Sequence, residues 1–230
     1  MRFVGPNIIT NNLIYYFDAA NPKSYVSGSA VCSNLLPTPI SGALLNGPIF
    51  SSSSKGILTF NGTDEYILLE SSSILNIPSG SLEIWCRTND PTSSLAQHFI
   101  SRNNQSGGTF NILKNVNSTY SGWYFRFRAG GIQVAATSSK IANSEWTHLV
   151  GTFTNSTGSL YVNGILDGFV YQSGDIDTTS YASMTIGSNA GTTGYASGSV
   201  ALAKIYNRAL TSDEVLKNYN ATKDRFIWYL

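Results

Sequence analysis

The chain has 230 residues, and its 14 basic and 13 acidic side chains give a net charge of +1. Charged residues make up 12% of the chain, about half of the roughly 25% in average globular proteins. The near-neutral charge argues against a nucleic-acid binder that neutralises phosphates, and 12% aromatic residues argue against disorder. No apolar run approaches the roughly 18–20 residues of a membrane span, so membrane insertion is not expected. Instead, 32 Ser, 20 Thr and 21 Asn supply the polarity.

Short apolar runs separated by Gly, Asn, Ser and Asp recur along the chain, which is typical of many strands joined by turns. Residues 27–56 carry only weak strand signals, and Asn61-Gly62 and Asn163-Gly164 predict turns between strands. No helical crossovers separate the strands, so we predict an all-β fold, an antiparallel β-sandwich. The predicted strands cover residues 13–17, 56–60, 66–69, 81–87, 99–102, 123–128, 146–153, 159–162, 165–170, 184–187 and 200–206.

One helix is predicted near the C-terminus. Thr211 and Glu214 have the spacing of a capping box, in which each side chain bonds the backbone N–H of the other residue. An apolar stripe follows, but about ten residues are too few for a stable isolated helix. We therefore expect this helix to dock on the sheets.

The two cysteines, Cys32 and Cys86, are too few for a disulfide framework. One disulfide and two free thiols are both compatible with the sequence. The first residues lack the apolar segment of a secretory signal. If the protein works outside a cell, we therefore expect it to leave the cell by a route other than a secretory signal.

Several motifs, taken in chain order, resemble laminin-G-like domains of the concanavalin A-like lectin/glucanase superfamily. They are Leu58-Thr-Phe-Asn-Gly-Thr-Asp-Glu-Tyr66, Ser81-Leu-Glu-Ile-Trp85, Glu145-Trp-Thr-His-Leu-Val-Gly-Thr-Phe153, Gly158-Ser-Leu-Tyr-Val-Asn-Gly164, Met184-Thr-Ile-Gly187 and the segment 203–215. The resemblance covers residues 13–222. It implies a jelly-roll sandwich over 13–222, an N-terminal extension over 1–12 and an apolar tail over 223–230.

The segments 5–10, 17–25 and 218–223 resemble single-domain structural proteins of tailed bacteriophages. This resemblance implies a virion surface protein, such as a fibre, decoration or adhesion component. Its expected partners are other virion proteins, further copies of itself as a homo-oligomer, and host surface glycans. It would also explain an extracellular protein without a signal peptide, because virions leave by lysis.

Glucanases with this fold place two or three carboxylates close together on one strand. This sequence has five glutamates, and none has a second carboxylate two positions away on a predicted strand: Glu65, Glu70, Glu83, Glu145 and Glu214. His98 and His148 have no nearby Ser–Asp or Cys partner in the sequence. We therefore expect no catalytic residues, and a glycoside hydrolase stays the third alternative after a glycan-binding module and a structural virion subunit.

Glycan binding would use aromatic rings for the apolar faces of sugars and amide or hydroxyl groups for their hydroxyls. Tyr195 lies in the Gly-rich segment 191–198 and is the best single candidate. Tyr120 and Tyr124 follow a second polar loop. The tryptophans are better explained by the core of the sandwich: Trp85, Trp123 and Trp146.

Laminin-G-like domains often bind one Ca²⁺, an ion that takes six to eight oxygen ligands. The candidate ligands are Asn61, Asp64 and Glu65 in one loop, and Asp18 after the first strand. The alternative is that the loop residues make turn hydrogen bonds only. Ca²⁺ therefore remains an optional cofactor.

The last five residues are all apolar: Phe226, Ile227, Trp228, Tyr229 and Leu230. An exposed patch of this kind usually marks an interface. We expect the tail either to dock onto a neighbouring subunit or to fold back onto its own sandwich.

Overall fold

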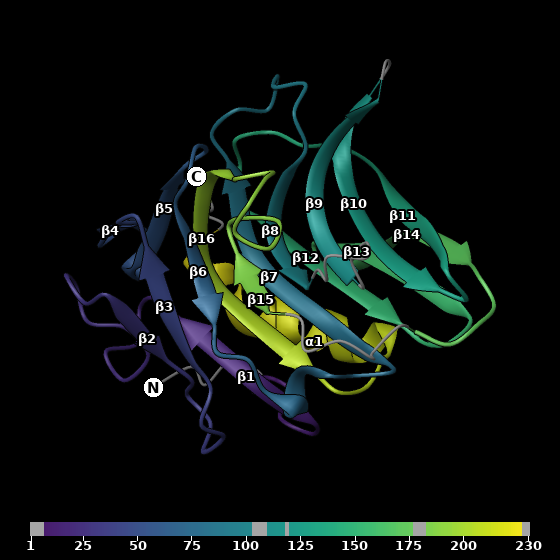
Figure 1. The fold of residues 1–230 in the computed structure, drawn as a ribbon, viewed down its shortest axis with the longest axis horizontal. Helices are drawn as coiled ribbons and strands as arrows, with labels where there is room; N and C mark the ends of the chain where they lie inside the picture. Colours follow the sequence, from purple (N-terminus) through teal and green to yellow (C-terminus); the bar gives the residue numbers. More distant parts are fainter. Residues whose placement is uncertain (1–6, 103–109, 118–119, 177–182, 227–230) are drawn as a thin grey trace.

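The computed structural model describes residues 7–102, 110–117, 120–176 and 183–226. Two antiparallel sheets pack face to face and one short helix near the C-terminus accompanies them (Figure 1). The predicted fold class, an antiparallel sandwich of the concanavalin A kind with a C-terminal helix, is confirmed. Among the described residues, no helix is long and apolar enough to span a membrane.

The first sheet, sheet A, has the strand order β14-β13-β12-β7-β16-β5-β4, and β1 also pairs with β16. In β7, β12 and β16 nearly every residue is buried on both faces, so these strands form the centre of the sheet. Its strands are β1 (Leu13–Asp18), β4 (Ile49–Ser51), β5 (Ile57–Asn61), β7 (Gly80–Thr88), β12 (Thr147–Phe153), β13 (Thr157–Val162), β14 (Ile165–Tyr171) and β16 (Ser197–Tyr206).

The second sheet, sheet B, has the strand order β11-β10-β9-β8-β15-β6-β3-β2. The long strands β9, β10 and β11 lie side by side in Figure 1. The strands of this sheet are β2 (Val31–Ser33), β3 (Ser41–Leu45), β6 (Tyr66–Leu69), β8 (Gln97–Arg102), β9 (Phe110–Asn117), β10 (Tyr120–Ala129), β11 (Ile132–Ile141) and β15 (Met184–Ile186).

The main core fills the space between the two sheets. Trp123, Phe125 and Phe127 alternate along β10 and all join this core. Because successive strand residues point to opposite faces, Tyr124, Arg126 and Arg128 must lie on the outer face of sheet B. The core aromatic residues and the polar residues of β10 therefore lie on opposite faces of the sheet.

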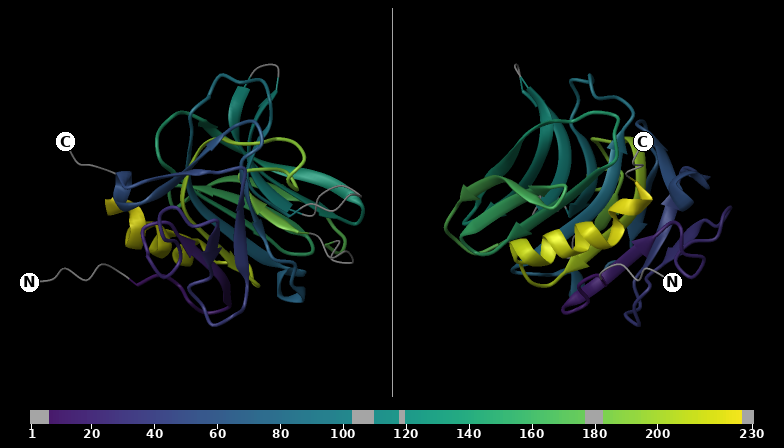
Figure 2. Two further views of the ribbon diagram at one scale, coloured as in Figure 1. Left: turned by 60° about the vertical axis from the view of Figure 1, so that its left-hand side comes forward. Right: turned by 180° about the vertical axis from the view of Figure 1, so that it is seen from behind.

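Helix α1 (Ser212–Thr222) begins at the predicted capping box, since Thr211 and Glu214 bond each other's backbone N–H groups. The helix lies behind the strands in Figure 1 and in front of them when the molecule is turned by 180° (Figure 2, right). It covers part of the outer face of sheet A, which leaves the outer face of sheet B on the other side. Three short 3₁₀ segments complete the described helical structure: Ser53–Lys55, Ser73–Leu75 and Lys223–Arg225.

Several strands were absent from the sequence prediction. The structure contains β9 and β11, and β2, β3 and β4 form within the weakly patterned stretch 27–56. Both cysteines are free and buried, which agrees with the two-thiol alternative. Cys32 lies in β2, beside the Tyr15 hydroxyl, and burial raises the pKa of its thiol to about 11.

Candidate functional site

The outer surface of strands β8 to β11 is the strongest candidate site, and we call it the β8–β11 face. Residues directly opposite each other in antiparallel strands share one face of the sheet. One row across this face joins His98, Leu113, Tyr124 and Thr137, and the next joins Ser101, Asn111, Arg126 and Ala135. The predicted ligand residue Tyr124 therefore lies at the centre of this face.

Two polar side chains on the β8–β11 face are buried but incompletely bonded. Asn111 is 6% exposed and its Oδ1 atom has no hydrogen-bond partner; His98 is 5% exposed and its Nδ1 atom has none. Buried polar atoms are nearly always paired, since an unpaired one costs about 1–3 kcal/mol. Both atoms are shielded from solvent, as are Ser101, Leu113 and Tyr124 on the same face, so this face holds unused hydrogen-bonding capacity just beneath its surface.

Arg126 lies directly opposite Asn111 in the strand register and is half-buried. Burial lowers its pKa, while the nearby Tyr124 raises it. Burial, followed by the charge of Arg126, lowers the pKa of His98 to about 3. His98 is therefore neutral at ordinary pH, and its ring can accept a hydrogen bond through one nitrogen and donate through the other.

The second predicted aromatic, Tyr195, borders the same face from the side of β6. Its ring is half-buried, lies 6.1 Å from that of Tyr66, and its hydroxyl donates to the carbonyl of Gly191 at 2.7 Å. The carbonyl of a later glycine, Gly194, accepts the His98 amide, and Gly194 packs so closely on the His98 ring that an added Cβ would lie 2.6 Å from it. The structure thus brings Tyr195 and Tyr124 to one side of the sandwich, with His98 between them.

Tyr120 begins β10 and its backbone pairs with Asn117, but its side chain lies outside the described residues. The sequence prediction missed Asn111, His98 and Arg126 as site residues. The alternation in β10 could have placed Arg126 beside Tyr124 on the outer face. No local signal could have added Asn111 or His98, since strand pairing brings them there.

The predicted Ca²⁺ ligands are held by other contacts. Asn61 Oδ1 accepts the backbone N–H groups of Thr63 and Asp64 at 2.8 and 3.2 Å, and its Nδ2 donates to Asp64 Oδ1 at 2.8 Å. Glu65 Oε2 accepts the Asn61 amide at 2.8 Å. These are the turn hydrogen bonds of the alternative interpretation.

Asp18 does not join that loop. It pairs with Leu202 on β16 whereas Asn61 pairs with Ser197, a separation of roughly 17 Å along the strand at about 3.4 Å per residue. Its Oδ1 instead forms an ion pair with Arg225 at 2.7 Å. Within the described ranges, no group of three or more His, Cys, Asp or Glu residues is placed to hold a metal ion.

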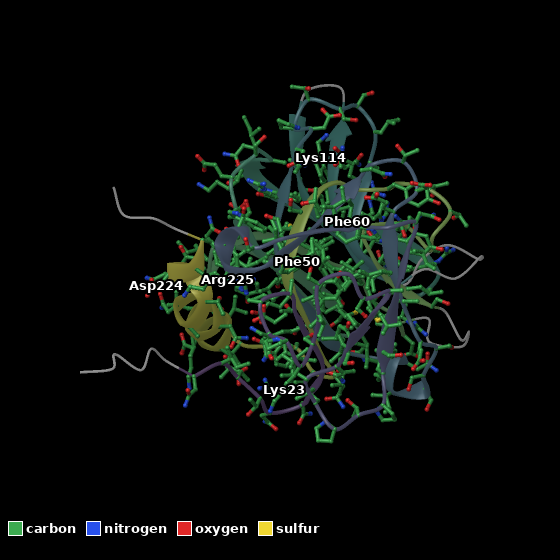
Figure 3. All side chains as sticks on the ribbon, turned by 90° about the vertical axis from the view of Figure 1, so that its left-hand side faces the viewer. Lys23, Phe50, Phe60, Lys114, Asp224 and Arg225 are labelled. Carbon is green, nitrogen blue, oxygen red and sulfur yellow. The ribbon has the colours of Figure 1, made fainter. Side chains whose placement is uncertain are left out.

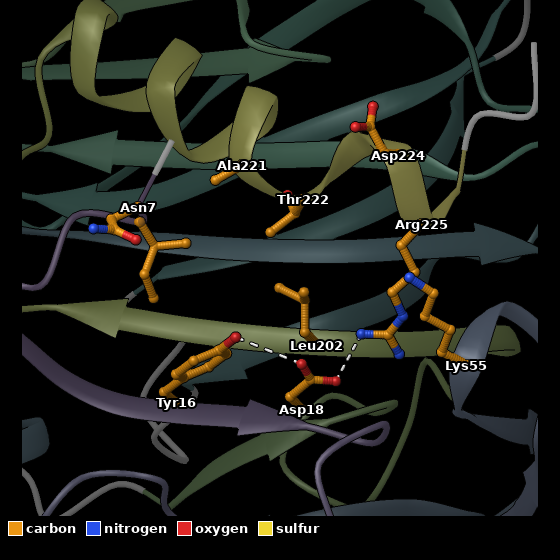
Figure 4. Close-up of a pocket in the computed structure, with 10 residues that line it drawn as sticks. Asn7, Tyr16, Asp18, Lys55, Leu202, Ala221, Thr222, Asp224 and Arg225 are labelled. Atoms are coloured by element: carbon orange, nitrogen blue, oxygen red, sulfur yellow. Dashed lines mark hydrogen bonds and ion pairs between the residues drawn. The ribbon is translucent and has the colours of Figure 1, made fainter. Parts of the chain in front are cut away.

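A pocket of about 440 Å³ lies where β1 and β16 meet the C-terminal segment (Figure 4). Arg225 pairs with Asp18 here and also donates to the carbonyls of Ser54, at 2.5 Å, and Gly56. Figure 3 shows Arg225 on the side of the molecule that carries α1. These bonds satisfy Asp18 and Arg225 and fasten the C-terminal segment, whereas Lys55 and Asp224, the other charged residues of the lining, are exposed to solvent.

A larger groove of about 730 Å³ runs beside Trp146, at the edge where the two sheets meet. Two of its polar side chains are already used: Asp167 accepts from Ser138 and Ser139, and Asn163 Oδ1 accepts the His148 amide. Lys140 and Glu145 also line this groove, and among the described residues their charged groups make no hydrogen bond or ion pair, so the groove is a second candidate beside the β8–β11 face.

A buried ionic cluster lies beneath α1 on the outer face of sheet A, and no local pattern in the sequence indicates it. Glu83 accepts from Lys204 at 2.6 Å, from His148 Nε2 at 3.1 Å and from Asn218 at 2.6 Å. Asn218 Oδ1 in turn accepts the Ile9 amide at 2.7 Å. The cluster is fully enclosed and ties three strands, the helix and the N-terminal segment together, which makes it structural rather than a binding site.

Next to this cluster, Phe226 is 6% exposed and stacks on Trp85, with ring centroids 4.2 Å apart. It also lies 5.0 Å from the half-buried Trp146. Phe226 therefore folds back onto its own sandwich, as the second alternative for the tail expected. Residues 227–230 lie outside the described part of the chain. Trp85 and Trp123 are buried, as predicted for core residues.

Solved structures with the same architecture include carbohydrate-binding and receptor-binding domains. Domain 4 of AbnA, a GH43 extracellular arabinanase from Geobacillus stearothermophilus, in complex with arabinotriose, has a TM-score of 0.67 at 15% identity, covering 90% of this chain and 98% of that one. The binding domain of Paraclostridial Mosquitocidal Protein 1 has a TM-score of 0.70 at 14% sequence identity, and the match covers 92% of this chain and 52% of that one. Trypanosoma rangeli sialidase has a TM-score of 0.67 at 15% sequence identity, and the match covers 95% of this chain and 34% of that one.

The chain thus spans about half of that toxin domain and a third of the sialidase, and at these identities the similarity concerns the fold. A search of curated proteins found no match. The sequence profile of the Laminin_G_3 family, described as the concanavalin A-like lectin/glucanases superfamily, matches residues 61–216, which is more than half of the chain. The chain therefore belongs to the concanavalin A-like lectin/glucanase superfamily.

Proposed function

We propose that this protein is a non-catalytic glycan-binding module and that the β8–β11 face is its binding surface. The observation that carries the proposal is the pair of buried, unpartnered atoms, Asn111 Oδ1 and His98 Nδ1, beside Tyr124. Sugars present hydroxyls to such atoms and apolar ring faces to an aromatic side chain. The arabinotriose complex of the AbnA domain, which shares this fold, supports the same class of ligand.

Asn111→Leu is the sharpest test, because folding and binding should respond in opposite directions. Leucine has nearly the same shape and removes a buried acceptor that has no partner, so stability should hold or rise by about 1 kcal/mol. Binding to the glycans that the wild type recognises on a printed array should fall about tenfold or more. Asn220→Leu on α1, on the other side of the sandwich, is the matched control.

Melting temperatures and array titrations would be measured for all three proteins. Unchanged glycan binding by Asn111→Leu would remove the β8–β11 face from the proposal. A wild-type protein that recognises no glycan on the array would count against glycan binding altogether.

We further propose that the module works on the surface of a bacteriophage virion, as a fibre, decoration or adhesion component. The support is the resemblance of the two ends of the sequence to phage structural proteins, and the thinly charged composition. A purely structural virion subunit, in which the sandwich mediates assembly, is the second candidate. The apolar residues beyond Phe226 favour it.

Deleting residues 227–230 tests the structural candidate. Phe226 stays in place in this variant, so the melting temperature should change by less than about 2 °C, because only the tail beyond the packed ring is lost. If the tail joins subunits, the oligomer measured by light scattering should dissociate. A deletion variant with unchanged mass in solution would rule out the tail as an interface.

Glycoside hydrolysis is the remaining alternative, and the carboxylate positions give it little support. Glu83 is enclosed beneath α1 and bonded to Lys204, so no substrate can reach it. Release of reducing sugar from a β-glucan panel, abolished by replacing a single carboxylate, would establish an enzyme instead.

A further inference from the structure

Charge is distributed very unevenly along this nearly neutral chain. Between Asp90 and Glu145 there is no acidic residue, and five basic residues occur there: Arg102, Lys114, Arg126, Arg128 and Lys140. This stretch therefore carries +5 and, since the whole chain carries +1, the remainder carries −4. The stretch contains β8, β9, β10 and β11 complete, so the β8–β11 face is built from strands without a single carboxylate.

Most of these cations are already engaged with the protein. Lys114 Nζ points inward and donates to the carbonyl of Ser93 at 2.6 Å; Figure 3 shows this lysine toward the opposite end of the molecule from Lys23. Arg102 donates to Asn76 Oδ1, and Arg128 Nε donates to the Gly131 carbonyl at 3.0 Å. These contacts are structural and explain three of the five positive charges.

Arg126 differs from these three residues and from Lys140, which is exposed. It is half-buried on the β8–β11 face, yet within the described ranges its guanidinium makes no hydrogen bond or ion pair. Among the described residues, the titratable side chains next to it on this face are Tyr124, His98 and Arg128, and none of them is a carboxylate. Removing a guanidinium from water without giving it a partner costs free energy. Folding has already removed part of the water around Arg126, so an anion that binds here has a smaller desolvation cost to overcome.

The neighbours of Arg126 define what else the ligand must carry. Asn111 Oδ1 is an unpartnered acceptor that calls for an O–H or N–H donor, and His98 Nδ1 is a second unpartnered atom, which accepts when the ring proton is on Nε2. The planar guanidinium fork matches a carboxylate through two parallel hydrogen bonds. One ligand that offers an anion, several hydroxyls and an apolar ring face is an acidic sugar.

We propose that the β8–β11 face recognises glycans that carry a carboxylate, with Arg126 holding the carboxylate and Asn111 and His98 accepting sugar hydroxyls. This inference rests on the proposed glycan-binding function and adds the class of sugar to it. Sulfated sugars present an anion of similar size, and the test below separates them from carboxylates.

The test uses matched pairs of oligosaccharides that differ only in charge. Oligogalacturonate, glucuronate-containing and sialylated oligosaccharides are each titrated into the full chain beside their methyl esters, together with sulfated and neutral oligosaccharides. At least one acid should bind about tenfold more tightly than its ester, and this preference should shrink as salt is raised. The affinity would be measured by calorimetry.

Three variants assign the effect to Arg126. Arg126→Met should lose about tenfold or more in affinity for the acid and leave the ester unchanged. Arg126→Lys should recover only part, because lysine keeps the charge and loses the paired geometry. Lys217→Met on α1 removes the same charge from an exposed site on the other side and should bind like the wild type.

Each outcome has a distinct meaning. If no acid binds more tightly than its ester, or if Arg126→Met keeps the preference, the carboxylate inference is overturned. Binding to sulfated members alone would also overturn it and assign the site to sulfate esters. Neutral glycans that bind the wild type and are lost in Asn111→Leu would leave the proposed function standing while the acidic specificity fails.

Discussion

Replacing Lys204 by methionine is expected to lower the free energy of unfolding by about 3–5 kcal/mol, because it leaves the Glu83 carboxylate buried without its cation. Both side chains are fully buried and 2.6 Å apart. Burial alone would raise the pKa of Glu83, but the Lys204 ammonium and the His148 ring hold it at about 2. Denaturant unfolding at pH 7 would measure the loss, with Lys217→Met as the exposed control.

The double variant Glu83→Gln/Lys204→Met separates the charge effect from the packing effect. An uncharged pair of similar volume avoids the cost of the stranded charge, so the double variant should be more stable than Lys204→Met alone. The side-chain carbonyl of the introduced glutamine would still accept the hydrogen bond from Asn218 Nδ2. If the double variant loses as much free energy of unfolding as Glu83→Gln and Lys204→Met lose together, the cluster is not a coupled ionic unit.

The buried ionic cluster also determines whether the free energy of unfolding rises or falls as the pH is lowered. The pKa of Glu83 lies below its ordinary value of 4.5, so its contribution is complete above pH 4.5 and lost as the pH falls toward 2. Burial lowers the pKa of His148, so its contribution likewise falls below its ordinary pKa of 6.5. The stability difference between wild type and Lys204→Met should therefore shrink in acid. A difference that grows below pH 4.5 would contradict this.

Phe226→Ala is expected to cost about 3 kcal/mol, because it removes an aromatic ring that is stacked on Trp85 and nearly enclosed. The C-terminal segment would then lose its hold on the sandwich at this position. Thermal unfolding and the fluorescence of the tryptophans it contacts would report the change. Leu216→Ala, at a helix position that is 43% exposed, is the control and should change stability far less.

A loss below about 1 kcal/mol for Phe226→Ala would show that the ring contributes little to the fold. Phe226→Ala and the deletion of residues 227–230 together test the role of Phe226 separately from that of the residues after it. Phe226 is expected to affect stability, and the residues after it are expected to affect assembly only.

The features that local sequence determined are those made by neighbouring residues. Thr211 and Glu214 lie three residues apart, so the capping box needs no tertiary contact to be recognised. The alternation of aromatic and polar residues around Tyr124 likewise indicates which residues share each face of β10. By contrast, β9 and β11 lack the alternation of apolar and polar residues that predicts a strand. In β9 the charged Lys114 occupies a buried position, and most residues of β11 are exposed.

The buried ionic cluster and the candidate site both depended on tertiary structure. Glu83, His148 and Lys204 are separated by more than fifty residues each, and only the order of the central strands of sheet A brings them together. The same holds for His98, Asn111 and Arg126, which come from three strands of sheet B. Strand register decides which side chains share a face, and a shift of one residue would reverse it.

The sequence by itself determined an antiparallel sandwich with a capped helix, because short-range patterns encode strands, turns and helix ends. It also contained the uneven charge, since a stretch without acids is visible in one dimension. Only the tertiary structure decided that Arg126 is half-buried and makes no hydrogen bond or ion pair among the described residues, because burial and pairing are properties of neighbours in space. It likewise decided that Phe226 belongs to the sandwich, since Trp85 lies 141 positions earlier in the chain.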